Sequence, residues 1–282
     1  MPQTISITDD SLKSGIMLSH LPVIKFSSSS IVYAILDTTS NSYVAFESRN
    51  LTDSNNIIEE IKQSALVKIL LNNGTGKSGK ALILIDNPVF TIVPDELFNP
   101  GDAKKYLSFT HSYQANEGIS IDKTGKVDSH NVYWLPQEIY TFIDRYFLLH
   151  EFRHFATIFL NCCFLKNKHQ EAVYVYASEN ILYAVVFKTG KPVLCNAYEY
   201  CTKEDFVYFV MNIFEKLQLN LQTTSLFISG ENENAVEYKK AISGYIVNVE
   251  FFTRSQKYNY CKGISEFPQY INSVLFSAFL CV

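Results

Sequence analysis

A segment of alternating apolar residues occurs twice in this chain, and this duplication constrains the fold more than any other feature of the sequence. The first copy, SSIVYAILDTTSNSYVAFES, spans residues 29–48, and the second, ENILYAVVFKTGKPVLCNAY, spans residues 179–198. At a shift of 150 residues the string IVYAIL, beginning at Ile31, aligns with ILYAVV, beginning at Ile181. An internal repeat of this kind predicts two halves of similar architecture.

The segments around each copy repeat as well. A β-rich string precedes each copy, LPVIKF in the first half and AVYVYA in the second, and a third strand follows a polar turn. An amphipathic helical pattern comes next, and a short apolar strand follows it at residues 81–86 and 225–230. The order strand, strand, strand, helix, strand therefore occurs twice. This order supplies four strands in each half, and we predict an α/β protein with two five-stranded mixed sheets and helices.

Both predicted helices have a capped start and an apolar stripe. Asn56 precedes Glu59, and Thr202 precedes Asp205, each pair at capping-box spacing. The stripes consist of Ile57, Ile58, Ile61, Ala65 and Leu66 in the first helix, and of Phe206, Val210, Ile213, Phe214 and Leu217 in the second. We expect these stripes to face the two sheets.

Composition indicates a globular protein and excludes some partners. The chain has 282 residues, 47% of them hydrophobic, and its formal net charge of -4 leaves no basic surplus for nucleic acid. No signal peptide or long uncharged apolar run is present, so we expect a cytoplasmic protein that is not membrane-embedded. The six cysteines form no CxxC pair and are expected to be buried, reduced thiols.

The string GTGKSGK, residues 74–80, resembles the end of a phosphate-binding P-loop. A P-loop leaves a strand and enters a helix, whereas this string follows a predicted helix and precedes the strand ALILI. Leu71 also occupies the position of the first P-loop glycine. We therefore expect residues 74–80 to form a solvent-exposed helix-to-strand turn without a ligand.

The string HEFRH matches the zinc motif H-E-x-x-H through His150, Glu151 and His154. The surrounding apolar spacing predicts a helix, on which both imidazoles would project from one face. Arg153 is unusual in such a helix, and neither Glu171 nor His169 belongs to a recognisable third-ligand motif. Zinc hydrolysis through His150 and His154 remains an alternative, and otherwise no metal site is expected.

Other acidic residues have structural interpretations. Asp86, Asp95 and Glu96 are spaced like residues of loops and helix starts. Residues 115–136 contain no calcium-loop pattern and are predicted to form a hairpin. No catalytic residue is predicted from these segments.

The duplicated organisation resembles the actin-like ATPase superfamily, in which two ribonuclease-H-like halves face each other across a nucleotide cleft. The strings YAILDTTSNSYVAFES, FTIVPDELF, YWLP and RHFATIFL are similar to an uncharacterised bacterial family, a domain of unknown function with this fold. The chain is more distantly similar to actin-like proteins of pilus and type II secretion assembly. The resemblance implies a first half at 1–165, with linking helices, and a second half at 166–282.

The resemblance also implies where a ligand would bind. Active members of the superfamily carry an Asp-Gly turn in each half and a glycine-rich turn beside the adenosine. The corresponding inter-domain cleft residues here are Ser27, Ser28, Ser29 and Ser30, then Glu179 and Asn180, then Gly230 and Glu231. Neither of the first two turns keeps the Asp-Gly pair, which implies lost or reduced hydrolysis.

These observations predict a non-catalytic actin-like interaction or scaffold protein with weak nucleotide binding in the cleft. The alternative is a nucleotide-dependent ATPase with atypical phosphate loops, and the lesser alternative is the zinc hydrolase. We expect no cofactor in the first case and ATP with Mg²⁺ in the second. A protein partner is expected, and nucleic acid is not.

Overall fold

The computed structural model describes residues 4–14, 16–51, 57–64, 67–68, 79–112 and 118–282. The chain forms two compact units. Unit 1 comprises residues 1–123, 130–155 and 256–267, and unit 2 comprises residues 124–129, 156–255 and 268–282. Each unit contains its own large sheet.

The sheet of unit 1 has seven strands among the described residues, in the order β1-β4-β3-β2-β5-β9, with β15 also pairing with β4. The strands are β1 (Thr4–Thr8), β2 (His20–Phe26), β3 (Ser30–Asp37), β4 (Ser42–Asn50), β5 (Ala81–Ile85), β9 (His150–His154) and β15 (Asn259–Tyr260). Strands β2, β3 and β4 are antiparallel, whereas β5 pairs parallel with β2 and β9 pairs parallel with β5. β2, β3 and β5 are almost wholly buried, and apart from His20 and Lys25 on β2 and the end residues of β3 they are apolar.

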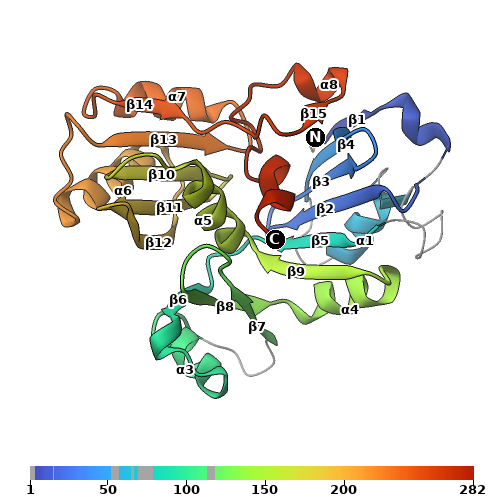
Figure 1. The fold of residues 1–282 in the computed structure, drawn as a ribbon, viewed down its shortest axis with the longest axis horizontal. Helices are drawn as coiled ribbons and strands as arrows, with labels where there is room; N and C mark the ends of the chain where they lie inside the picture. Colours follow the sequence, from blue (N-terminus) through green and yellow to red (C-terminus); the bar gives the residue numbers. More distant parts are fainter. Residues whose placement is uncertain (1–3, 15, 52–56, 65–66, 69–78, 113–117) are drawn as a thin grey trace. The chain divides into compact units, whose positions relative to one another are not determined.

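The sheet of unit 2 repeats this topology in the order β12-β11-β10-β13-β14 (Figure 1). Its strands are β10 (Ala172–Ala177), β11 (Ile181–Lys188), β12 (Lys191–Glu199), β13 (Ser225–Gly230) and β14 (Val249–Phe251). β10 to β12 are antiparallel and β13 and β14 are parallel to β10, as in the first sheet. The two predicted repeats lie in two separate sheets, which confirms the duplication. The five-strand count holds for unit 2, whereas β1 and β15 extend the first sheet beyond the prediction.

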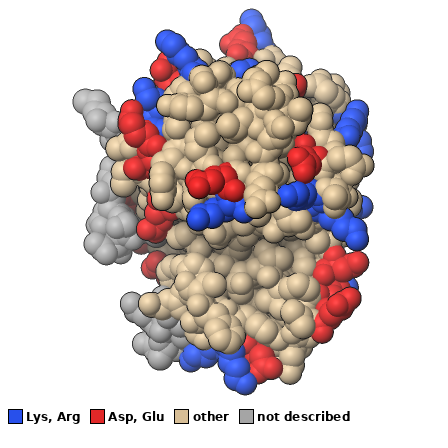
Figure 2. All heavy atoms as spheres, turned by 90° about the vertical axis from the view of Figure 1, so that its left-hand side faces the viewer, with Lys and Arg blue, Asp and Glu red and all other residues tan. Residues whose placement is uncertain are grey.

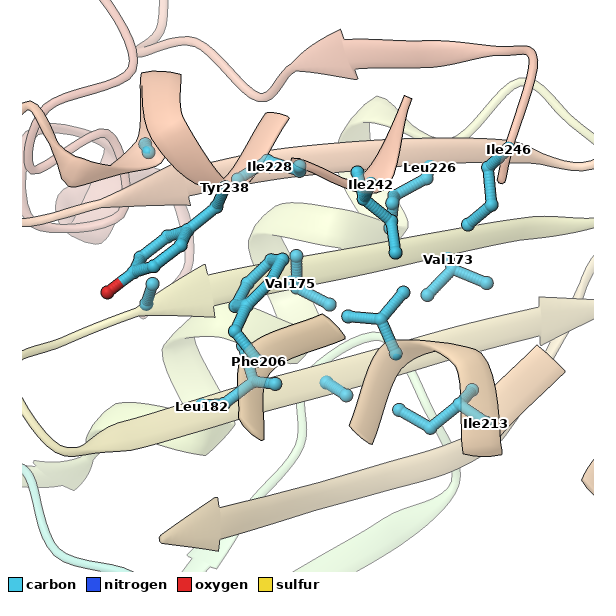
Figure 3. Packing of buried hydrophobic residues seen from close by; sticks show 14 of the residues in the cluster. Val173, Val175, Leu182, Phe206, Ile213, Leu226, Ile228, Tyr238, Ile242 and Ile246 are labelled. Carbon is cyan, nitrogen blue, oxygen red and sulfur yellow. The ribbon is translucent and has the colours of Figure 1, made fainter. Parts of the chain in front are cut away.

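The helices cover the sheet of unit 2 on both faces. α6 (Lys203–Lys216) and α7 (Asn234–Ile242) pack against one face, where Phe206 and Ile213 meet Val175 and Leu226 (Figure 3). α5 (Phe155–Lys166) packs against the other face, where Phe164 contacts Phe187. The predicted capping box of Thr202 and Asp205 is present, and it caps the N-terminus of α6.

A smaller sheet and short helices complete the chain. β6 (Phe90–Pro94), β8 (Ser129–Leu135) and β7 (Gly118–Lys123) form a three-stranded sheet in that order, which confirms the predicted hairpin. Among the described residues the remaining helices are α1 (Ile57–Gln63), α3 (Ala103–Ser108), α4 (Gln137–Tyr146) and α8 (Lys262–Ser265), with 3-10 turns at Asp10–Ser14, Asp95–Leu97, Pro100–Asp102 and Leu275–Leu280. None of the described helices is long and apolar enough to cross a membrane.

The string HEFRH forms strand β9 and not the predicted helix. α4 ends at Tyr146, the next residue, Phe147, has extended backbone angles, and α5 begins only at Phe155. β9 pairs along its whole length with β5. Tertiary pairing with an apolar strand therefore overrides the local helical spacing, as it does in many short segments that read equally well as helix or strand.

Two further predictions need correction. Within residues 74–80, Gly74 to Ser78 lie outside the described residues, but Gly79 is buried and donates a hydrogen bond to the carbonyl of His20 (2.9 Å). The end of this segment is therefore attached to the sheet and is not a solvent-exposed turn. All six cysteines are free thiols, and three of them are buried, whereas Cys201 is exposed.

Candidate functional site

The turn between β2 and β3, which carries Ser27 to Ser30, closes on itself through hydrogen bonds. The Ser27 N–H donates to the Ser30 carbonyl (3.0 Å), and the Ser27 hydroxyl accepts from the N–H groups of Ser29 (3.4 Å) and Ser30 (2.9 Å). Ser28 is exposed at the tip. Three of the four amide N–H groups thus have partners within the turn, and these are the groups that a phosphate would need.

The turn between β10 and β11 has the same geometry. The Ser178 N–H and hydroxyl both donate to the carbonyl of Ile181, at 3.0 and 3.1 Å. Ser178 therefore corresponds to Ser27, and Glu179 and Asn180 correspond to Ser28 and Ser29, which is a shift of 151 residues where the sequence alignment has 150. Glu179 and Asn180 are exposed, so a carboxylate stands at the tip of this second turn.

Gly230 and Glu231 lie beside the second turn, at the end of β13. Gly230 pairs with Ala177 across the parallel strands, and the Glu231 N–H donates to the Ala177 carbonyl (3.2 Å). The Gly230 carbonyl accepts from Asn272 N–H (2.8 Å). Within unit 2 the structure therefore brings Glu179, Asn180, Gly230 and Glu231 to one end of the sheet, while Ser27 to Ser30 belong to unit 1.

A side chain at position 230 would collide with the neighbouring strand. A Cβ atom there would lie 2.6 Å from the carbonyl oxygen of Ala177. We expect Gly230→Ala to lower the free energy of unfolding by about 1–3 kcal/mol, because backbone atoms must move to admit the methyl group. Urea denaturation measures this change.

Gly125→Ala is the matched control for that substitution. A Cβ atom at position 125 meets no heavy atom within 4 Å. The stability of the Gly125→Ala protein should equal or exceed that of the wild type by up to about 1 kcal/mol, because alanine restricts the unfolded chain. Equal effects at the two glycines would contradict the close approach of β13 to β10.

A buried ion pair lies next to the first turn and was missed in the sequence. Lys25, on β2, places its Nζ 2.9 Å from the Oδ2 of Asp86, and both side chains are fully buried. Lys25 is paired with Leu84 in the parallel ladder, so Asp86, two residues later, projects from the same face. Asp86 is therefore an ion-paired core residue and not the loop acid that its spacing suggested.

His154 belongs to a buried polar network on the neighbouring strand. Its backbone N–H donates to Asp122 Oδ2 (2.7 Å), and its Nε2 lies 3.1 Å from the Asn87 carbonyl. The hydroxyl of Tyr133 donates to the other oxygen of Asp122 (3.2 Å). Burial lowers the pKa of His154 to about 3, although Asp86 and the Asn87 carbonyl act in the opposite direction. The imidazole is therefore neutral, with its proton on Nε2.

The strand geometry of HEFRH removes the basis of the zinc alternative. Four residues of extended chain separate the Cα atoms of His150 and His154 by about 13 Å, whereas a helix would bring the two imidazoles together. The Nδ1 of His150 lies 2.8 Å from the Phe147 carbonyl, and Glu151 forms ion pairs with Lys80 and Arg153. Among the described residues no group of three or more His, Cys, Asp or Glu side chains could hold a metal ion.

Charged side chains of both signs occur in small groups on the face shown in Figure 2, with wide uncharged areas between them. The chain carries 24 Lys and Arg residues against 28 Asp and Glu residues. The face offers no continuous basic stripe of the kind that follows a nucleic-acid backbone.

A family model described as "Protein of unknown function (DUF3822)" matches residues 20–249. No curated protein sequence matches the chain. The family match covers the described strands of both sheets except β1, β15 and most of β14, so it includes the duplicated segments and both turns.

Three solved structures share the fold. A Bacteroides thetaiotaomicron protein with actin-like ATPase fold and unknown function aligns with a TM-score of 0.73 and 17% identity, over 86% of this chain and 93% of that chain. The PilM-PilN type IV pilus biogenesis complex gives a TM-score of 0.61 and 8% identity, over 92% and 97%. The ethanolamine utilization protein EutJ from Carboxydothermus hydrogenoformans gives 0.51 and 9%, over 96% and 94%. The fold is therefore that of the actin-like ATPases.

Proposed function

This chain belongs to the DUF3822 family of proteins of unknown function, and we propose that it is a non-catalytic interaction or scaffold protein built on the actin-like ATPase fold. In this proposal the chain acts through contacts with a protein partner. Nucleotide binds weakly or not at all, and its hydrolysis plays no part.

The ion pair of Lys25 and Asp86 carries the proposal. A carboxylate that organises Mg²⁺ must present its oxygens to the metal and its waters. Asp86 is the acid beside the first turn, since its N–H donates to the Phe26 carbonyl (2.8 Å), yet its side chain is fully buried against Lys25. The residues at this turn therefore do not fit a hydrolytic Mg²⁺–ATP centre.

The two turns give independent support. Hydrolysis of a phosphoanhydride depends on preorganised donors and cations around the developing negative charge. Ser27 uses its hydroxyl within its own turn, and the tip of the equivalent turn in unit 2 carries Glu179, whose charge would repel phosphate. The same arrangement weakens the alternative of an ATPase with atypical loops.

The fold neighbours supply the argument for a protein partner. The PilM structure is a complex with PilN, a protein, and it aligns over 92% of this chain. At 8% identity this likeness concerns the fold and does not transfer the partner. We therefore propose that the partner of this chain is a protein, but we do not propose that this partner is PilN.

A thermal shift measurement with Mg²⁺–ATP tests the proposal of weak binding. A ligand that binds only the native state raises its stability by RT ln(1 + [L]/Kd). We expect millimolar Mg²⁺–ATP to stabilise the protein by no more than about 1 kcal/mol, a rise in Tm of about 2–4 °C at most. Mg²⁺ alone and Mg²⁺ with inorganic phosphate are the controls. A rise of 10 °C that requires the whole nucleotide would contradict the proposal.

A further inference from the structure

Two thiol groups of unit 2 lie against each other in the interior. The Sγ of Cys162, on α5, is 3.1 Å from the Sγ of Cys281, which follows the 3-10 turn Leu275–Leu280. Within the described part of the chain no other two cysteines make a sulfur–sulfur contact. The two residues are 119 positions apart, so the fold and not the local sequence brings their sulfur atoms together.

Hydrogen bonds hold the segment around Cys281 beside α5. The Nδ2 of Asn161, the residue before Cys162, donates to the Cys281 carbonyl (3.1 Å). The beginning of the same segment is attached to the end of β13, where the Asn272 N–H donates to the Gly230 carbonyl (2.8 Å). The backbone on both sides of the sulfur contact is therefore fixed in the native fold.

The pair suits a disulfide because its sulfur atoms need to move little. The S–S bond of a disulfide is about 2.05 Å long, so the two sulfur atoms must approach by about 1 Å. Cys281 is 9% exposed and Cys162 is 2% exposed, so we assign the first contact with an oxidant to Cys281. The hydrogen bond with Cys281, together with burial, holds the pKa of Cys162 well above its ordinary value, so Cys162 is a protonated thiol.

We propose that Cys162 and Cys281 are a redox modification site, which hydrogen peroxide converts to a disulfide and a thiol reductant restores. The Cys281 thiolate attacks one peroxide oxygen, the O–O bond breaks, and the departing hydroxide takes up a proton, which leaves a sulfenic acid. The Cys162 sulfur then attacks the Cys281 sulfur, the S–O bond breaks, and the departing hydroxide takes the Cys162 proton. Two thiols are thus oxidised, and one peroxide is reduced to two waters.

The disulfide closes a loop that contains the whole sheet of unit 2. All five strands, β10 to β14, lie between residues 162 and 281. A cross-link over a long loop restricts the unfolded chain and so favours the folded one. Oxidation therefore stabilises unit 2. The site includes neither of the two turns, and it stands whether or not they bind nucleotide.

Cys163 provides the matched control. It is buried next to Cys162 on the same helix. Consecutive residues of an α-helix point in directions about 100° apart, so the Cys163 side chain leaves the helix on a different side. A disulfide that depends on the observed contact must therefore use Cys162 and not Cys163.

Peptide mapping of the full chain tests the pairing. The protein is treated with hydrogen peroxide, and free thiols are blocked with N-ethylmaleimide before unfolding and digestion with trypsin, which prevents exchange. The tryptic peptide 154–166 should be linked to the peptide 263–282, and the number of free thiols should fall by two. Cys162→Ala and Cys281→Ala should each abolish the link, whereas Cys163→Ala should keep it.

Thermal unfolding supplies the second readout. The Tm of the peroxide-treated wild type should exceed that of the reduced protein by about 5–10 °C, and dithiothreitol should remove the difference. Cys162→Ala should show no difference, and Cys163→Ala should show the wild-type difference. The proposal is overturned if peroxide leaves all thiols free, oxidises single cysteines without a link, or forms a link that Cys163→Ala abolishes. A link that leaves the Tm unchanged equally overturns it.

Discussion

Asp86→Ala is expected to lower the free energy of unfolding by about 3–5 kcal/mol, because it removes the carboxylate that is paired with the buried ammonium group of Lys25. The Lys25 Nζ lies 2.9 Å from Asp86 Oδ2, and neither side chain is exposed to solvent. The ring of Phe155 also contacts the Nζ, with its centroid at 5.4 Å, but a ring cannot replace a carboxylate. Urea denaturation at pH 7 measures the change.

The control removes both charges together. Lys25→Met combined with Asp86→Leu removes both charges of this pair and should recover most of the stability lost in Asp86→Ala. Lys80→Ala breaks an exposed pair with Glu151 on the same sheet and should change stability by no more than about 1 kcal/mol. A loss of less than about 1 kcal/mol in Asp86→Ala would show that Lys25 finds water or another partner, and would contradict the buried pair.

Acid should destabilise the protein through His154. Burial, the largest cause, lowers the pKa of His154 to about 3 in the folded protein, against 6.5 for an ordinary histidine. Between these pH values the unfolded state binds a proton that the folded state does not, so the free energy of unfolding falls as the pH falls. The expected slope from this residue is about 1.4 kcal/mol per pH unit, or about 3 kcal/mol between pH 6.5 and 4.

Carboxylates also titrate in this range, so the test compares variants. His154→Gln keeps an N–H donor for the Asn87 carbonyl but cannot bind a proton. Its free energy of unfolding should fall less steeply with acid than that of the wild type. His169→Gln changes an exposed histidine and should keep the wild-type slope. Equal slopes for the wild type and His154→Gln would mean that His154 titrates normally.

The sequence predicts the repeated architecture because the features that determine it are local and occur twice. Alternating apolar residues mark the strands of both halves, and Thr202 with Asp205 marks the start of α6. The strands β9 and β14, which lie at one edge of each large sheet, were harder to predict from the sequence. Both are short, and their pairing partners are distant in sequence. HEFRH shows the limit of prediction from apolar spacing, because a five-residue segment is too short for that spacing to distinguish a helix from a strand.

The turns that carry the candidate site residues were predictable in position, but the interactions around them were not. The superfamily pattern places the turns at Ser27 to Ser30 and at Glu179, and both segments do form turns between antiparallel strands. The partnership of Lys25 with Asp86 joins residues 61 positions apart, so no local pattern reveals it. A lysine inside the apolar string LPVIKF and an aspartate after ALILI were the available signals, since a buried charge requires a partner.

Steady-state ATP turnover tests the absence of hydrolysis most directly. The full chain, purified and supplied with ATP and Mg²⁺, should release phosphate at the rate of a buffer control, and Ser28→Ala and Glu179→Ala should not change that rate. Both residues are exposed at the tips of their turns, so these variants should keep the wild-type stability within about 0.5 kcal/mol. Mg²⁺-dependent phosphate release that Glu179→Ala abolishes would contradict the account and would make the second turn part of an active site.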